Sequence, residues 1–428
     1  MAMKVARAAA ETVSEKVEGL ILDNEYPAVQ QPGLMTDLSE GAALEFSEGV
    51  TFSLKADEAA YVMRGEIPDE PKDQADAIQA CTDHPEVEGV FSDPVIETSP
   101  VCGGDAPQGT ADEVGRLLDT QQLQKLGMEG QGVYAAVVDT GINLQHIVAR
   151  GLDVELDAAH SWTPPSVSTQ PGTHPVDHGT MCAYDVAVVA PRVRLLDHAV
   201  LLSQAGGETV MSGLLSDAVL AYAQLQSVLS GMEADKRALV VSNSWGMYDP
   251  RWDFPIGHPG NYSHNPRHPF NIIVQSLVSA GADVLFAAGN CGRDCPDDRC
   301  GYGQDKSISG ANSLPAVLCV AGSDVNKNRV GYSSQGPGTF DARKPDLSAY
   351  THFAGSGVWE ADSGTSAACP VLAGYVAAIR SRHPSSEISP MQLRSLLYKT
   401  AEDMGGTGYD FDHGWGLPNT QALLAKLS

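Results

Sequence analysis

The sequence has few basic residues and no long apolar run. Its 428 residues include 27 Lys and Arg against 54 Asp and Glu, so the formal net charge is −27 at pH 7. That balance repels phosphate backbones and disfavours nucleic-acid binding. No apolar stretch reaches the roughly 18 residues that a membrane-spanning helix needs. We therefore expect no nucleic-acid partner and no membrane span.

Cysteine is also scarce, because eight residues in 428 are too few for a fold built on disulfides. The first residues carry basic side chains without the apolar run of a secretory signal. As written, the sequence predicts a cytoplasmic protein, or a secreted one if a signal has been removed. Hydrophobic residues make up 43% of the chain, which is enough for a large core and argues against disorder.

Short apolar runs alternate with helical patterns over the larger, C-terminal part of the chain. These runs are continuous rather than alternating, which is typical of strands covered on both faces. They lie at 132–138, 238–242, 284–288 and 316–321. Strands of this kind separated by amphipathic helices predict an α/β fold, with a mostly parallel central sheet and helices on both of its faces.

The chain ahead of this region has a different pattern. We expect a partly helical N-terminal extension over 1–48, a small α+β domain over 49–98, a linker over 99–112 and the α/β domain over 113–428. The linker is rich in Gly and Pro and has no periodicity. Within the small domain the pattern predicts strands at 49–55, 59–65 and 86–96 and a helix at 72–82.

Polar residues stand where the predicted strands end and where two apolar helices begin. Asp139, Ser244 and Asn290 follow strands, whereas His178 and Ser366 open helices. Ligands bind at the carboxyl ends of strands in open parallel sheets. Peptide hydrolysis by a hydroxyl group needs a nucleophile, a base, a carboxylate behind the base and donors for the oxyanion. All four types of group are present here.

Residues from about 130 to 425 resemble the subtilase family of serine peptidases. The resemblance rests on six blocks in the family's order: Ala135–Ile142, His178–Thr180, Ser242–Gly246, Ala287–Asn290, Tyr332–Gly336 and Ser363–Ala367. It implies that Ser366 is the nucleophile, His178 the general base and Asp139 its orienting carboxylate, with Asn290 as an oxyanion donor. The implied activity is that of a serine endopeptidase that forms an acyl-enzyme, acts on proteins or peptides and needs no cofactor.

The same resemblance places an extended substrate between two segments of the chain. The residues that it assigns to substrate binding are Ser244, Trp245 and Gly246 on one side and Ala287, Ala288 and Gly289 on the other. Trp245 stands where a smaller apolar residue is common in subtilisins. Its side chain therefore either narrows the subsites or packs into the core, and the sequence leaves both interpretations open.

Two features of the chain depart from the family's pattern. The family's Ala-Pro-Gly after Lys-Pro-Asp is missing, because Lys344-Pro-Asp346 continues as Leu-Ser-Ala-Tyr350. The segment from His178 to Val189 reads as a plain helix without the family's calcium-binding loop, so we carry over no metal site. Cys291, Cys295 and Cys300 lie in an acidic loop after Asn290. An internal disulfide, a divalent-cation loop and reduced thiols all remain open for them. We expect Cys182 and Cys369 to be inert core residues.

The small N-terminal domain resembles, weakly, the inhibitory propeptide of subtilases, mainly over His84–Pro94. The resemblance implies a zymogen whose own N-terminal domain acts as an intramolecular inhibitor and is cut within 96–112. The alternative is a catalytically silent subtilase-fold protein that binds peptides or regulates a partner. An esterase of the α/β-hydrolase type would need a Gly-x-Ser-x-Gly elbow and the order Ser, Asp, His, which this sequence does not have.

Overall fold

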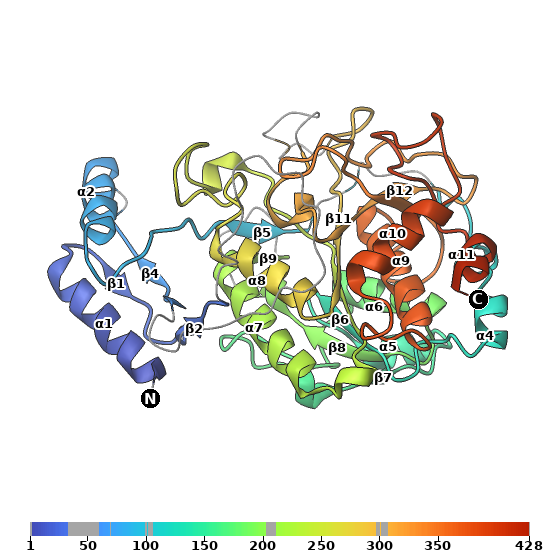
Figure 1. The fold of residues 1–428 in the computed structure, drawn as a ribbon, viewed down its shortest axis with the longest axis horizontal. Coiled ribbons are helices and arrows are strands. Elements are labelled where there is room, and N and C mark those ends of the chain that lie inside the picture. The colour runs from blue at the N-terminus through green and yellow to red at the C-terminus, as the bar shows by residue number, and fades with distance from the viewer. Residues whose placement is uncertain are drawn as a thin grey trace.

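The computed structural model describes residues 2–32, 60–68, 70–98, 101, 106–202, 211–296, 300 and 307–427. Its centre is a seven-stranded parallel sheet in the order β13-β12-β11-β10-β6-β8-β7 (Figure 1). The strands are β6 (Tyr134–Val138), β7 (Glu155–Leu156), β8 (Arg194–His198), β10 (Leu239–Asn243), β11 (Asp283–Ala287), β12 (Leu318–Ser323) and β13 (Leu347–Tyr350).

Helices cover both faces of this sheet. The helices are α3 (Ala111–Leu117), α4 (Thr120–Lys125), α5 (Leu144–Ala149), α6 (His178–Val189), α7 (Leu215–Gly231), α8 (Pro269–Ser279), α9 (Thr365–Arg380), α10 (Pro390–Thr400) and α11 (Thr420–Leu427). Successive strand residues enter opposite cores: Val137 packs with α6 and α9, whereas Val138 packs with α7 and α8. Burial on both sides explains why these strands are apolar without alternation.

The predicted fold class is confirmed, and all four predicted strands of the α/β domain are present within a few residues of their expected bounds. Three strands of the sheet were missed. β8 carries two polar residues, Asp197 and His198, which are buried, and β7 and β13 are short. The apolar stripe at helical spacing that the sequence shows over 209–230 forms a helix, α7, only from Leu215, because Ser212–Leu214 forms a separate strand, β9.

The N-terminal part forms a unit beside the α/β domain (Figure 1). It contains α1 (Ala2–Lys16), α2 (Pro71–Thr82) and two antiparallel pairs of short strands. The pairs are β1 (Ile21–Leu22) with β4 (Gly65–Glu66) and β2 (Val29–Gln30) with β3 (Tyr61–Val62). α1 and α2 meet in a small core of Val13, Val17, Ala77 and Cys81.

Both pairings join residues on the two sides of the domain boundary that we predicted between residues 48 and 49. Residues before and after that point belong to one packed unit, and two-residue strands leave no periodicity from which this could be predicted. The helix predicted at 72–82 is present as α2. Of the strand predicted over 86–96, only β5 (Val95–Glu97) forms, and 59–65 contains β3 with the start of β4. The strand predicted at 49–55 lies outside the described residues.

Residues 106–110 of the predicted linker run along the α/β domain just ahead of α3. The backbone N–H of Gln108 donates to the carbonyl of His352 at 2.8 Å, and that of Ala354 donates to Gly109 at 2.8 Å. Residues 106–110 are therefore fixed next to the segment that leads to Ser366. Among the helices that the structure describes, none is long and apolar enough to cross a membrane.

Candidate active site

The candidate catalytic residues gather at the carboxyl ends of the central strands. β6 and β10 are neighbours at the point where the strand order reverses direction. Asp139 follows β6, Ser244 follows β10 and Asn290 lies just beyond β11. An open parallel sheet binds ligands at such a reversal, because loops from adjacent strands separate there.

Asp139 and His178 are hydrogen bonded. Asp139 Oδ1 lies 2.8 Å from His178 Nδ1, and both side chains are buried. His178 is the first residue of α6, where the Asp177 side chain accepts its backbone N–H at 2.9 Å. With Nδ1 bonded to the carboxylate, Nε2 is left to act on a substrate or nucleophile.

The two short motifs that carry these residues are joined directly. The N–H of Gly179 donates to Thr140 Oγ1 at 2.8 Å. A Cβ on Gly179 would lie 2.5 Å from the carbonyl oxygen of Gly141. Only glycine permits that approach. The Asp-Thr-Gly and His-Gly-Thr patterns therefore work together, because each supplies a residue that holds the other loop in place.

Cys182 lies at the centre of this group. Its sulfur is 3.7 Å from Asp139 Oδ2, 3.7 Å from His178 Nδ1 and 3.5 Å from the carbonyl oxygen of Ser366. Donor atoms of Asp139, His178 and Cys182 are close enough together to hold a metal ion. Asp139 Oδ1 and His178 Nδ1 are already bonded to each other at 2.8 Å, however, and burial raises the pKa of the Cys182 thiol. The sulfur instead packs under the site.

Ser366 is the second residue of α9, next to the end of β10. The Ser244 hydroxyl donates to the Ser366 carbonyl at 3.0 Å, and the Ser366 hydroxyl donates to the Ser244 carbonyl at 3.5 Å. Among the hydrogen bonds of the described residues, none joins the Ser366 hydroxyl to His178. Catalytic hydrogen bonds are often loose until substrate binds, and rotation about one side-chain bond changes the direction of this hydroxyl.

Asn290 is oriented by the residue that precedes Ser366. Its Oδ1 accepts hydrogen bonds from the Thr365 N–H at 2.9 Å and from the Thr365 hydroxyl at 3.1 Å. A Cβ on Gly364 would lie 3.0 Å from Asn290 Nδ2 and 3.3 Å from the Ser366 nitrogen. The side-chain amide and a helix N-terminal N–H thus border one small space. Gly364 has φ +79°, which also favours glycine.

Two chain segments flank this space, Ser244–Gly246 and Ala287–Gly289. The side-chain amide of the buried Asn312 joins them, since Nδ2 donates to the Trp245 carbonyl at 3.1 Å and to the Ala287 carbonyl at 2.9 Å. Asn312 is not among the site residues predicted from the sequence. It lies in a short 3₁₀ turn with no periodic pattern, so the sequence carries no local signal of this role.

The Trp245 side chain does not line the cleft. It is fully buried, its Nε1 donates to the Val138 carbonyl at 3.0 Å, and its ring packs on Phe270 and Phe286. Of the two interpretations that the sequence left open, core packing is therefore the one present. As a candidate substrate-binding residue, Trp245 can contribute only its backbone.

The structure also shows the state of several cysteines. Cys291 and Cys300 form a disulfide, so the internal bridge is the one present among the three options left open for this loop. Cys182 and Cys369 are free and buried. Burial raises the pKa of the Cys369 thiol to about 12, so this side chain stays protonated and packs as an apolar group.

Part of the N-terminal unit lies in the cleft. β5 pairs antiparallel with β9 on one side. On its other side, Glu97 exchanges two backbone hydrogen bonds of 3.0 Å with Gly246. Ile96 is fully buried, and a Cβ on Gly364 would lie 3.3 Å from Val101 Cγ1. Glu97 therefore lies next to Gly246, and Val101 lies next to Gly364 and the space bordered by Asn290 and Ser366.

Comparison with known proteins agrees with this geometry, because residues 130–416 match the Subtilase family. The chain belongs to the subtilase family. It is 28% identical to subtilisin BL of Lederbergia lenta over 303 residues, which cover 69% of this chain and 92% of that protein. It is 29% identical to subtilisin Savinase of the same organism over 307 residues, with the same coverage of each chain.

Subtilisin DY of Bacillus licheniformis is 27% identical over 313 residues, which cover 72% of this chain and 96% of that protein. Among solved structures, a lanthipeptide protease aligns with a TM-score of 0.52 and 19% identity, covering 76% of this chain and all of that one. At this identity the structural match supports the subtilase fold alone. The family predicted from the six sequence blocks is thus confirmed, and the chain is a member of a serine protease family.

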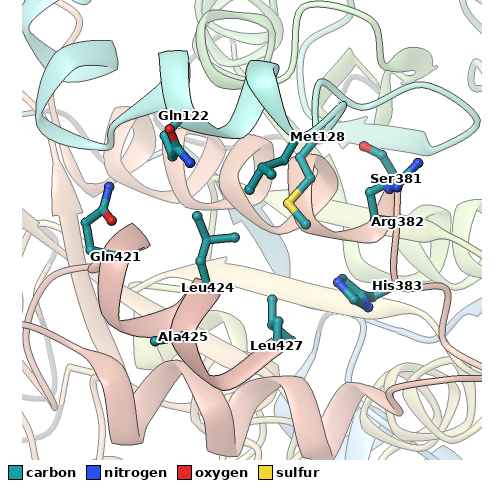
Figure 2. A pocket seen from close by; sticks show the side chains of 10 residues that line it. Gln122, Met128, Ser381, Arg382, His383, Gln421, Leu424, Ala425 and Leu427 are labelled. Atoms are coloured by element: carbon teal, nitrogen blue, oxygen red, sulfur yellow. The ribbon is translucent and has the colours of Figure 1, made fainter.

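A hollow of about 740 Å³ lies away from the candidate catalytic residues (Figure 2). Its lining comes from α4, the end of α9 and α11, and includes Leu126, Met128, His383 and Leu424. None of the candidate catalytic residues borders it. We therefore place the candidate active site at the carboxyl ends of the central strands and not in this hollow.

Proposed function

We propose that this subtilase is an active serine endopeptidase, made as a zymogen that its own N-terminal unit inhibits. The observation that supports this most is the hydrogen bond between Asp139 and His178 beside the helix start that bears Ser366. A silent peptide-binding protein would need the cleft. Peptide binding alone would not require an imidazole that is held by a buried carboxylate.

In this proposal the Ser366 hydroxyl attacks the carbonyl carbon of the peptide bond. His178 Nε2 removes the hydroxyl proton and later passes it to the leaving amine, and Asp139 stabilises the imidazolium that forms in between. The acyl-enzyme is then hydrolysed by water that the same imidazole activates. The first step requires the Ser366 hydroxyl to turn from the Ser244 carbonyl toward Nε2.

The developing oxyanion would sit between Asn290 Nδ2 and the backbone N–H of Ser366. Thr365 fixes the side chain of Asn290 through Oδ1, so the NH₂ group is held in place before substrate arrives. The N-terminus of α9 adds the positive end of a helix dipole. Donors placed in advance stabilise the transition state because they need no reorganisation.

Substrate would bind as an added strand, and the pairing of Glu97 with Gly246 supports this mode. The same contact supports self-inhibition, since β5 occupies the cleft. Further contacts hold it there: the Asp93 carboxylate accepts from the N–H and the hydroxyl of Ser216, both at 2.7 Å, and His268 Nε2 lies 3.0 Å from the Ser92 carbonyl. We place the cut between residues 98 and 103.

Processing of the full-length chain tests this function. The wild-type protein should lose about 100 N-terminal residues on incubation and then hydrolyse an unfolded protein such as casein. The Ser366→Ala variant should stay intact and inactive, because it keeps the fold and lacks the nucleophile. Intact mass measurement gives the new N-terminus. A wild-type protein that stays full length and hydrolyses nothing would favour the silent binding protein.

A further inference from the structure

The segments Ser244–Gly246 and Ala287–Gly289 form the first and the second wall of the cleft. The side chain of Tyr248 occupies the space between them. Tyr248 follows the first wall by two residues, and only 5% of it is exposed. A Cβ on Gly246 would lie 3.1 Å from Cζ and 3.2 Å from Oη of Tyr248. A Cβ on Gly289 would lie 3.3 Å from Cε1 of the same ring. The phenol ring therefore lies between glycines of both walls.

This space is the one that the residue on the acyl side of the scissile bond would use. Its carbonyl must reach Ser366 and Asn290. The first wall contacts Ser366 through Ser244, and the second wall is followed directly by Asn290. The backbone of an extended peptide is held at Gly246, as Glu97 shows. A side chain that projects from the peptide next to Ser366 would thus enter between Gly246 and Gly289. There it would meet the ring of Tyr248.

We propose that Tyr248 closes most of this pocket and restricts the enzyme to substrates with Gly, Ala or Ser on the acyl side of the cleaved bond. The inference rests on the proposed function and adds a substrate class to it. The protein's own segment agrees, because Glu97 lies at Gly246, Val101 lies at Gly364, and the residues between them in sequence are Thr98, Ser99 and Pro100. None of these three has a large side chain.

A set of fluorogenic tetrapeptides tests this directly. The substrates are Ile-Glu-Thr-X-aminomethylcoumarin, which copy residues 96–98, with X as Gly, Ala, Ser, Leu or Phe. For the processed wild-type enzyme we expect kcat/KM to be at least about 100-fold higher for Ala than for Phe, as a filled apolar pocket can discriminate by that much. Comparable rates with Phe and Ala would overturn the inference with no variant needed.

Variants of Tyr248 then test whether its ring causes the preference for small residues at X. Tyr248→Ala should raise kcat/KM for Leu and Phe by about 10–100-fold, whereas Tyr248→Phe should keep the wild-type order because it keeps the ring. Met247→Ala is the matched control, since Met247 is also 5% exposed and packs in the core. It should leave the preference unchanged. An unchanged Ala-to-Phe ratio in Tyr248→Ala would overturn the inference.

The two proposals fail in different ways. If the wild-type protein hydrolyses the Leu and Phe substrates at rates comparable to that of the Ala substrate, the endopeptidase stands and the role of Tyr248 is wrong. If it hydrolyses no substrate at all, the proposed function fails and the inference fails with it.

Discussion

Asp139 Oδ1 lies 2.8 Å from Nδ1 of His178, although the two residues are 39 positions apart. The strand end of β6 and the first turn of α6 produce this contact, and the hydrogen bond from Gly179 to Thr140 keeps the two loops together. The carboxylate therefore fixes both the tautomer and the orientation of the imidazole. This arrangement is what a general base needs before it can accept a proton from a hydroxyl group.

Replacing the carboxylate tests that role. Asp139→Asn keeps the shape of the side chain and removes the charge, so His178 is held in the wrong tautomer. We expect kcat for peptide hydrolysis to fall about 10⁴-fold with little change in fold. Asp177→Asn is the control, because Asp177 accepts the backbone N–H of His178 and an amide oxygen accepts equally well. Equal activity of the two variants would contradict the role of Asp139.

Removal of the side-chain donor tests the oxyanion site. Asn290→Ala should lower kcat by about 10²–10³-fold with little change in KM, since the donor acts mainly in the transition state; this magnitude is the one established for subtilisin, a relative of this chain. Steady-state kinetics on the processed enzyme separates the two constants. A rise in KM at unchanged kcat would place Asn290 in substrate binding instead.

Removal of the Asn312 side-chain amide, which joins the cleft walls, should affect both the stability of the protein and its binding of substrate. Asn312→Ala removes the hydrogen bonds to the carbonyls of Trp245 and Ala287. Leaving buried carbonyls unpaired should lower the free energy of unfolding by roughly 1–3 kcal/mol. KM should rise because the walls are no longer held apart at a fixed distance. Denaturant unfolding and kinetics measure the two effects. Asn326→Ala, at an exposed position, should change neither.

A pair of buried carboxyl groups predicts how stability depends on pH. Asp185 on α6 and Asp362, four residues before Ser366, are both fully buried. Burial raises the pKa of Asp362 to about 6, and burial together with Asp362 raises that of Asp185 well above its usual range. Asp362 accepts the N–H and the hydroxyl of Ser356. Asp185 therefore holds the shared proton.

Because both pKa values are raised, the folded protein binds this proton more tightly than the unfolded chain does. The pair's contribution to stability is complete below about pH 4, the usual range for Asp, and is lost progressively as the pH rises through the raised pKa values, of which that of Asp362 is about 6. Asp185→Asn supplies a permanent donor. It should match the wild type near pH 4 and exceed its free energy of unfolding by roughly 1–3 kcal/mol at pH 8.

Urea unfolding at several pH values measures this difference. The control is Asp153→Asn, which changes an exposed carboxylate and should give no such trend. A difference between Asp185→Asn and the wild type that is the same at pH 4 and pH 8 would show that the pair does not bind an extra proton.

The candidate catalytic residues were accessible from the sequence because each belongs to a local pattern. Asp139 ends an apolar strand, and His178 and Ser366 begin apolar helices. Strand ends and helix starts are set by neighbouring residues, and the parallel sheet then brings the ends together. The fold class and the four central strands could be predicted for the same reason.

What the sequence did not reveal depends on contacts between distant residues. Pairing of Ile21 with Glu66 joins described residues on both sides of the boundary predicted at 48, and two-residue strands are too short to show a periodic pattern. The strand β8 was missed because Asp197 is polar, although it is buried and accepts backbone N–H groups from Ile142 and Gly172. The positions of Asn312 and Tyr248 between the cleft walls likewise require the tertiary structure.

The central claim is that Ser366 is a nucleophile activated by His178. Labelling with a fluorophosphonate probe tests it most directly, with peptide mass spectrometry to locate the adduct. We expect one adduct, on Ser366, in the processed wild-type protein. His178→Ala should lose the adduct, and Asp177→Asn should keep it. Failure of the processed wild-type protein to react, or an adduct on a different serine, would contradict the account.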